Sequence, residues 1–210
     1  MKKIIAVNAG PEMGWNKESL IMEASKGAES AGAAVERFDL FRLEKYTGCI
    51  SCFRCKTEEF KGHCVCRDGL SPVLDAIQEA DGMIIGYPSY YSDMTSSARA
   101  LYERLIFPYL TDNYKIACCK EPPTPVLVII NCKAPDAGFM KILRNYQRLL
   151  SSTVGPAQFF ISGNTLESGD SSKSGWPCAM SGSDEQEEHH QTLCPKDCKK
   201  VFTLGVNLAG

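Results

Sequence analysis

The sequence contains no apolar run that reaches the ~18 residues needed to span a bilayer, and it has no excess of positive charge. Its 23 basic and 25 acidic residues give a net charge of −2, which excludes a strongly basic nucleic-acid binder. The N-terminal MKKIIAVNAG has only a short apolar run before Asn8 and Gly10, so we expect a buried strand there and no signal peptide. We therefore expect a cytoplasmic protein with neither membrane nor nucleic-acid partners.

The familiar catalytic motifs are also missing. The chain has three histidines, His63, His189 and His190, all in segments predicted to be irregular, and no Ser–His–Asp arrangement stands out. Neither the P-loop pattern nor the glycine-rich dinucleotide fingerprint occurs. We predict no catalytic side chain, and any chemistry would have to come from a bound cofactor.

Cysteine, by contrast, is abundant, with 11 among 210 residues. The odd count leaves at least one thiol without a partner in the chain, and without a secretory signal we expect no disulfides. The rest of the composition, 44% hydrophobic and 23% charged residues, is typical of one soluble globular domain.

Hydrophobic patterning predicts strands and helices in alternation. We expect strands at 3–8, 34–40, 82–87, 124–131 and 157–162, and helices at 18–31, 71–80, 95–107, 139–150 and 195–208. The run 124–131 is apolar throughout, as in a parallel strand covered on both faces. This order predicts an α/β flavodoxin-like doubly wound parallel five-stranded sheet (order 2-1-3-4-5) in three α/β/α layers, over a single domain 1–210.

Local signals refine this arrangement. Ser71 and Pro72 are typical of a helix N-cap and first helical position. A cysteine-rich loop is expected at 47–67 and a variable Gly/Ser-rich loop at 163–190. Ligands of such sheets bind beyond the carboxyl ends of the strands at the switch between the first and third strands. The predicted site is therefore formed by the loops 9–19, 88–95 and 131–138.

Three motifs in order carry a resemblance to a known family. The loop NAGPEMGWNKES, residues 8–19, is similar to the phosphate loop N-G-S-P-R-x-x-x-N-T of the NADPH-dependent FMN reductase-like flavodoxin family. The stretch Gly48–Cys55 resembles its G-C-x-x-C-x-x-C motif, and GYPSYY at Gly86–Tyr91 resembles its loop after the third strand. The ending Pro195–Gly205 is also similar to some members, which include relatives of the iron–sulfur flavoproteins.

The resemblance implies an FMN-dependent oxidoreductase that takes electrons from NAD(P)H, as a homodimer or homotetramer. The first loop would hold the phosphate, and the loop after the third strand would hold the ring, for which Tyr90 and Tyr91 offer flat faces. One of the two tyrosines could instead be a partly buried packing residue. The implied cofactor-binding residues are Gly10, Pro11, Glu12, Asn16, Lys17, Ser19, Pro88, Ser89, Tyr90, Tyr91, Ser92 and Asn131.

The phosphate loop departs from the family pattern. Gly10, Glu12 and Lys17 stand where the family has Ser, Arg and Thr, so two donors are lost and an acid is gained. A carboxylate ~6 Å from a phosphate dianion costs on the order of 5 kcal/mol at an effective dielectric of ~20. Glu12 must therefore point away or pair with a cation such as Lys17, or else FMN binds weakly.

Five cysteines form the pattern C-x2-C-x2-C-x8-C-x-C, at positions 49, 52, 55, 64 and 66. The first three have ferredoxin-like spacing, and Cys64 or Cys66 would complete a set of four. Our candidate ligands for a [4Fe-4S] cluster are Cys49, Cys52, Cys55 and Cys64. The gap before the fourth is longer than in the iron–sulfur flavoproteins, so zinc or free redox-active thiols remain alternatives.

Three functions follow from these alternatives. The first is an FMN oxidoreductase that reduces a flavin, a quinone or another small electron acceptor. The second is an iron–sulfur flavoprotein that carries electrons to a redox protein. The third is a non-catalytic thiol-sensing domain with a degenerate phosphate loop.

Overall fold

The computed structural model describes residues 1–11, 16–60, 62–111, 113, 115–132, 135–163 and 184–210, with backbone only for 16–19 and 184–194. Five parallel strands form one sheet in the order β2-β1-β3-β4-β5, as predicted. Their bounds are β1 Lys3–Asn8, β2 Ala34–Asp39, β3 Gly82–Pro88, β4 Val126–Cys132 and β5 Ala157–Gly163. The helices are α1 Asn16–Ser30, α2 Ser71–Gln78, α3 Ser96–Ile106, α4 Ala137–Thr153 and α5 Asp184–Ala209.

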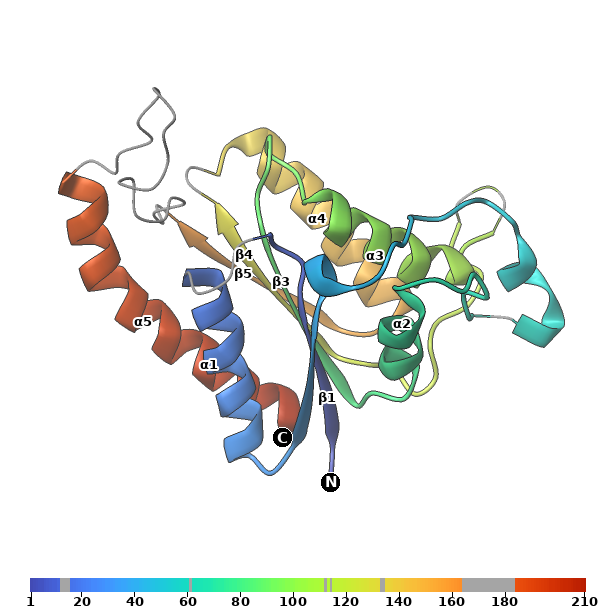
Figure 1. The fold of residues 1–210 in the computed structure, drawn as a ribbon, viewed down its shortest axis with the longest axis horizontal. Helices are drawn as coiled ribbons and strands as arrows, with labels where there is room; N and C mark the ends of the chain where they lie inside the picture. Colours follow the sequence, from blue (N-terminus) through green and yellow to red (C-terminus); the bar gives the residue numbers. More distant parts are fainter. Residues whose placement is uncertain (12–15, 61, 112, 114, 133–134, 164–183) are drawn as a thin grey trace.

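Helices cover both faces of the sheet (Figure 1). Helices α1 and α5 lie side by side on one face, and α2, α3 and α4 cover the other. Two buried apolar clusters fill the two interfaces, and every residue of β3 and β4 is buried. The continuous apolar pattern of β4 is thus explained by helices on both sides.

Helices α1 and α5 approach so closely that their contact depends on glycine. A Cβ atom on Gly27 would lie 2.1 Å from the carbonyl oxygen of Phe202, and one on Gly205 would lie 1.9 Å from that of Ala24. Real side chains do not tolerate such distances, so this packing accounts for glycine in two helix interiors, where it otherwise weakens a helix.

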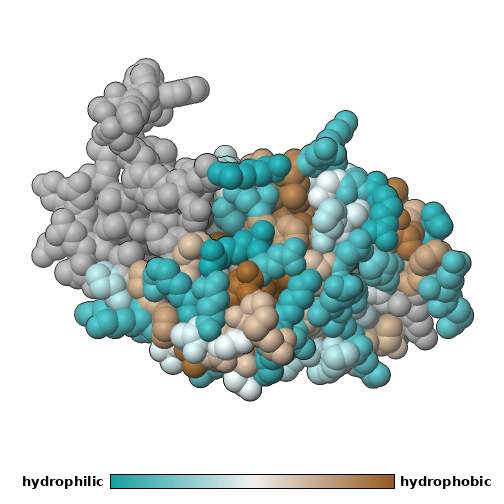
Figure 2. Space-filling view, turned by 60° about the horizontal axis from the view of Figure 1, so that its bottom comes forward, coloured by the Kyte–Doolittle hydropathy of each residue, from teal (hydrophilic) through white to brown (hydrophobic). Residues whose placement is uncertain are grey.

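The outer surface agrees with this burial. The face seen in Figure 2 is largely hydrophilic, with hydrophobic residues in small groups. Within the described ranges, no helix combines the length and the apolar character that a membrane crossing requires.

Some local expectations are wrong. Leu70, not Ser71, is the N-cap of α2, and Pro72 is its second residue. The Ser71 hydroxyl instead accepts the N–H of Asp68 and donates to the carbonyl of Cys66, so it ties the cysteine loop to the helix. Helix α5 begins at Asp184, so 184–190, with His189 and His190, are helical where a loop was expected. The remainder of that loop, 164–183, lies outside the described residues.

Short 3₁₀ helices occur in the segments between these elements. The cysteine loop contains two of them, η2 Arg54–Lys56 and η3 Glu58–Phe60. The others are η1 Leu40–Arg42, after β2, and η4 Phe107–Tyr109, which continues from α3. Helix α3 therefore continues directly into η4, which lies next to the cysteine loop.

Candidate functional site

The first candidate site lies where β1, β3 and β4 end. The Asn8 side chain accepts the N–H of Gly10 at 3.1 Å and so shapes the exit from β1. The carbonyl of Ala9 accepts hydroxyl hydrogen bonds from Thr95 at 2.7 Å and Ser97 at 2.9 Å. The start of α3 therefore holds the start of the first loop in place, and α1 begins at its far end.

The loop after β3 forms a tight turn across Tyr90–Asp93. The N–H of each end residue donates to the carbonyl of the other, at 2.8 and 2.9 Å. Tyr91 and Ser92, between them, have φ angles of +51° and +58°. Non-glycine residues in this left-handed region cost about 1 kcal/mol or more each, so surrounding contacts must hold the turn.

Asp93 supplies those contacts. Its carboxylate accepts hydrogen bonds from the Arg99 guanidinium at 2.6 Å, the Tyr146 hydroxyl at 3.2 Å and the N–H of Met94 at 2.7 Å. The Arg99 guanidinium also lies 5.1 Å from the centre of the Tyr146 ring. Because Arg99 belongs to α3 and Tyr146 to α4, two helices hold this turn.

Asn131, at the end of β4, has an unused acceptor. Its backbone carbonyl accepts the N–H of Ser89 at 2.7 Å, which joins the loop after β3 to β4. Its buried side-chain oxygen has no hydrogen-bond partner among the described residues. A buried acceptor of this kind is rare without a ligand or water. The flavin ring carries an N–H and the ribityl chain carries hydroxyls, so in this respect the edge fits FMN.

The structure gathers the predicted cofactor residues at this edge, as far as it describes them. Pro88 is buried and ends β3, whereas Tyr90 is 41% exposed and Tyr91 is fully exposed, so the Tyr91 ring is not a packing residue. Asn16, Lys17 and Ser19 fall in the first turns of α1, next to the loop, and their side chains are outside the description. Gly10 and the exposed Pro11 begin the loop, and Glu12 lies outside the described residues.

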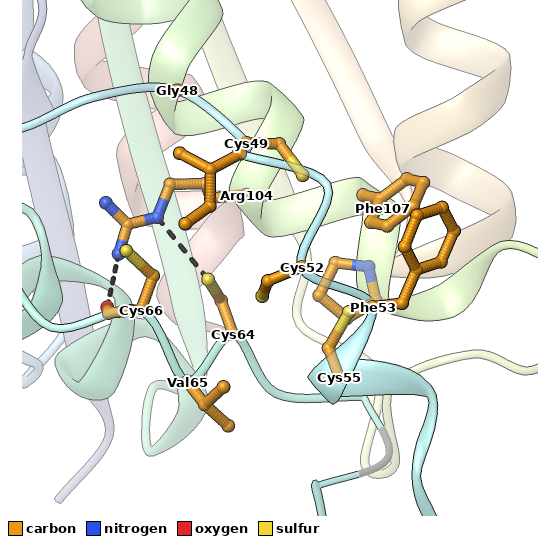
Figure 3. A pocket seen from close by; sticks show the side chains of 12 residues that line it. Gly48, Cys49, Cys52, Phe53, Cys55, Cys64, Val65, Cys66, Arg104 and Phe107 are labelled. Atoms are coloured by element: carbon orange, nitrogen blue, oxygen red, sulfur yellow. Dashed lines mark hydrogen bonds between the residues drawn. The ribbon is translucent and has the colours of Figure 1, made fainter.

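The second candidate site is a small cavity in the cysteine loop (Figure 3). All five loop cysteines line it, together with Arg104 and the first residues of η4. As the structure stands, however, no three metal-binding side chains within the described ranges are grouped closely enough to hold a metal ion. The thiolate donor set fits iron or zinc, but the side chains would have to turn toward a common centre.

The backbone around Cys52 is strained in the same way as the turn above. Ser51 and Phe53 have φ angles of +53° and +56°. The Phe53 ring packs edge-on against Phe107, with centroids 5.7 Å apart, and the Lys56 ammonium lies 4.2 Å from the centre of the Phe107 ring. These contacts hold the loop in a conformation that places the Cys52 side chain at the cavity.

The cavity disfavours isolated thiolates. Burial raises the pKa of the Cys55 and Cys66 thiols. The charges acting on Cys55 include those of Cys49, Cys52 and Cys64, which are its neighbours in the cavity. A bound cation would replace the thiol protons and compensate this cost.

Sequence reasoning missed Arg104 and Asp68 as parts of this site. The Arg104 side chain is fully buried, and it donates to both carboxylate oxygens of Asp68 at 2.7 Å. A signal was present, because position 104 falls on the inward face of α3 with Leu101 and Leu105. A charge on such a face points to a specific partner.

Comparison with known proteins identifies the family. Residues 2–118, more than half of the chain, match the family described as NADPH-dependent FMN reductase. The chain belongs to this family. Membership confirms the family predicted from the sequence.

Curated relatives of this FMN reductase family member include iron–sulfur flavoproteins. One from Methanocaldococcus jannaschii is 30% identical over 102 residues, which cover 49% of this chain and 51% of the relative. One from Methanosarcina thermophila is 26% identical over 104 residues, which cover 50% and 52%. The match thus spans about half the length of these relatives.

Solved structures confirm the flavodoxin-like fold. An NAD(P)H:quinone oxidoreductase from Methanothermobacter marburgensis superposes with a TM-score of 0.67 at 15% identity, over 99% of this chain and 98% of that one. An azoreductase from Bacillus anthracis gives 0.64 at 11% identity, over 99% and 100%. At such identities, the likeness concerns the fold alone.

Proposed function

We propose that this chain binds FMN at the edge formed by β1, β3 and β4 and transfers electrons from NAD(P)H to a flavin, a quinone or another small acceptor. The observation that carries the proposal is the buried side-chain oxygen of Asn131 at this edge, for which the described residues offer no hydrogen-bond partner. Bound FMN would supply hydride- and electron-transfer chemistry, so no nucleophilic side chain is required.

The protein's own residues would bind and orient the cofactor. The first turn of α1 offers backbone N–H groups and a partial positive charge to a phosphate. The Tyr90–Asp93 turn, fixed through Asp93, offers backbone groups and the exposed Tyr91 ring to the flavin. The oxygen of Asn131 would accept a hydrogen bond from an N–H or O–H of the ligand.

FMN binding can be measured by titrating a fixed amount of FMN with purified protein and following flavin fluorescence. We expect saturable quenching, and more than tenfold tighter binding by Glu12→Arg, because an unfavourable charge near the phosphate is replaced by a favourable one. The matched control is Glu23→Arg, on α1 but away from the loop. A wild-type protein that leaves FMN fluorescence unchanged would contradict the proposal and favour the thiol-sensing alternative.

The cysteine cavity favours a second function, that of an iron–sulfur flavoprotein that passes electrons to a redox protein. Cys49, Cys52, Cys55 and Cys64 would hold the cluster, and a [4Fe–4S] cluster would supply one-electron transfer. The names of the curated relatives support this candidate. Iron and sulfide analysis of anaerobically purified protein tests it, with the visible spectrum as a second measurement. Zinc in place of iron, or no metal at all, would reject it.

We also propose a cellular compartment and an oligomeric state for the protein. None of the nine cysteines whose side chains are described forms a disulfide, which supports a reducing compartment such as the cytoplasm. A homodimer or homotetramer is the assembly we propose, as the family resemblance implies. Sedimentation of the FMN-loaded protein at several concentrations measures it, and a monomer at all of them would reject it.

A further inference from the structure

We propose that Arg104 is the positioning residue of the cysteine cavity, and that its hydrogen bond to Cys64 makes Cys64, and not Cys66, the fourth thiolate for a bound thiophilic metal. The inference rests on the metal-binding function proposed for the cavity and is independent of FMN. It begins from the burial of a charged side chain that no step at the flavin edge requires.

Arg104 is an expensive residue to bury unless its charge is compensated. Its side chain has no exposed surface, and that of Asp68 is 15% exposed. Both terminal oxygens of Asp68 accept from the same guanidinium nitrogen at 2.7 Å. Asp68 also accepts the N–H groups of Thr47 and Leu70, at 3.2 and 3.0 Å, so the pair is held on several sides. Such geometry is what allows a buried ion pair to persist.

Further hydrogen bonds of Arg104 join the two arms of the loop. The nitrogen that contacts Asp68 also donates to the carbonyl of Thr47, two residues before Cys49, at 3.2 Å. Another donates to the carbonyl of Cys66 at 2.6 Å. Arg104 therefore fixes the chain that enters the cavity relative to the chain that leaves it, which a lysine with one nitrogen could not do.

The last donor, the Nε–H, is directed at a sulfur. Nε of Arg104 lies 3.4 Å from Sγ of Cys64, and this hydrogen bond is drawn as a dashed line in Figure 3. A donor from a charged guanidinium stabilises negative charge on its acceptor. Hydrogen bonds to ligand sulfurs are among the features by which proteins tune metal–thiolate sites.

Cys66 is held differently. Its carbonyl is occupied by Arg104 and by the hydroxyl of Ser71, at 3.0 Å, which fixes its backbone to the start of α2. In Figure 3 its side chain lies beyond Cys64 and away from Cys55, whereas Cys64 faces Cys52. The structure thus resolves a choice that spacing in the sequence leaves open.

The experiment uses Co²⁺ as the probe, added to anaerobic, metal-free full-length protein. Sulfur-to-cobalt charge-transfer absorption reports the number of bound thiolates. We expect a four-thiolate spectrum for wild type and for Cys66→Ser, and a loss of one thiolate for Cys64→Ser. Arg104→Lys should weaken Co²⁺ binding about 10–100-fold, the usual effect of losing an outer-shell partner.

A spectral shift separates tuning from simple scaffolding. At saturating Co²⁺, Arg104→Lys should move the charge-transfer band to longer wavelength, because the Cys64 sulfur loses its donor. The matched control is Arg67→Lys, in the same loop, whose side chain is 62% exposed and pairs with Asp75. This control should change neither affinity nor band position. Circular dichroism verifies that each variant is folded, and should Arg104→Lys fail to fold, the Cys64→Ser and Cys66→Ser pair still decides.

Several outcomes would overturn the inference. These are a wild type that binds no Co²⁺, a loss of the fourth thiolate in Cys66→Ser instead of Cys64→Ser, or a folded Arg104→Lys with unchanged affinity and band. Failure of the proposed function looks different. If the protein lacks iron as isolated but gives the expected Co²⁺ results, the iron–sulfur cluster is rejected and Arg104 remains the positioning residue. FMN titrations of the same variants test only the FMN site and do not bear on this inference.

Discussion

The candidate FMN site at the ends of β1, β3 and β4 and the cysteine cavity differ in the contacts that stabilise them. At the edge, backbone groups at strand ends make the site, and the side chain that stabilises it, Asp93, is partly exposed with its partners on two helices. At the cavity, an ion pair between the fully buried Arg104 and the largely buried Asp68 holds a loop that has little regular structure. The strand ends thus require only a few side-chain contacts at the surface, whereas the irregular cysteine loop depends on a buried ion pair that anchors it to the interior.

The largest expected effect concerns that anchor. Replacement of Arg104 by Met leaves the carboxylate of Asp68 buried without its cation, which should lower the free energy of unfolding by about 3 kcal/mol or more. Urea denaturation measures it. The double variant Arg104→Met/Asp68→Leu should recover most of the loss, because no charge is left unpaired. A single variant as stable as wild type would mean that the pair does not anchor the loop.

Acid should weaken the same anchor by a smaller amount, since protonation removes the charge but leaves the group. Burial opposes ionisation of Asp68, yet the hydrogen bonds from Arg104 and the backbone outweigh it, so the pKa of Asp68 is lowered. A lowered carboxylate pKa contributes stability above the unfolded value of about 3.9, and this is lost as pH falls through the folded value. Stability measured from pH ~5 downward should therefore decline less steeply in Asp68→Asn than in wild type. Equal slopes would argue against the linkage.

At the flavin edge the expected effect is on binding more than on folding. Asp93→Ala removes the acceptor for Arg99, Tyr146 and Met94 and frees the turn, so we expect FMN affinity to fall about tenfold, or about 1.4 kcal/mol. Fluorescence titration measures it. Asp75→Ala, an exposed carboxylate near the cysteine loop, is the control and should leave FMN affinity unchanged. Unaltered affinity in Asp93→Ala would mean that the turn is not part of the FMN site.

The smallest effects concern strain, which both regions share. Ser92→Gly and Ser51→Gly each place glycine at a positive φ and should raise the free energy of unfolding by up to about 1 kcal/mol. Thermal unfolding compares the two variants with wild type. If the strain serves to preorganise a site, Ser92→Gly should weaken FMN binding slightly and Ser51→Gly should not. Destabilisation by both substitutions would show that these positions are not strained.

The sequence predicts the fold well because its signals are periodic and local. The continuous apolar run of β4 and the alternation of elements suffice for strand order, since parallel connections leave few topologies. Strand bounds agree within two residues. The helix N-cap at Ser71 is wrong because its hydroxyl bonds to the cysteine loop, a long-range preference that a local pattern does not contain.

The candidate sites are predictable only in part. Motifs bring Gly10, Tyr90 and Asn131 to one edge because parallel strands share their direction. The ion pair of Arg104 and Asp68 joins positions 36 residues apart, and no spacing rule pairs an arginine on a helix with an aspartate in a loop. Such partners emerge from tertiary packing, although the charge on an apolar helix face indicates where to look.

Helix α3 contacts both sites, so the number of residues between its two contacts sets their relative position. Ser97, near its start, bonds to the loop after β1, and Arg104 lies seven residues further on at the cysteine cavity. At 1.5 Å per residue the two contacts are about 10 Å apart along the helix axis. One inserted residue would lengthen this spacing only slightly but would rotate Arg104 by about 100°, away from the cavity. The length of α3 between these two contacts is therefore fixed by both sites.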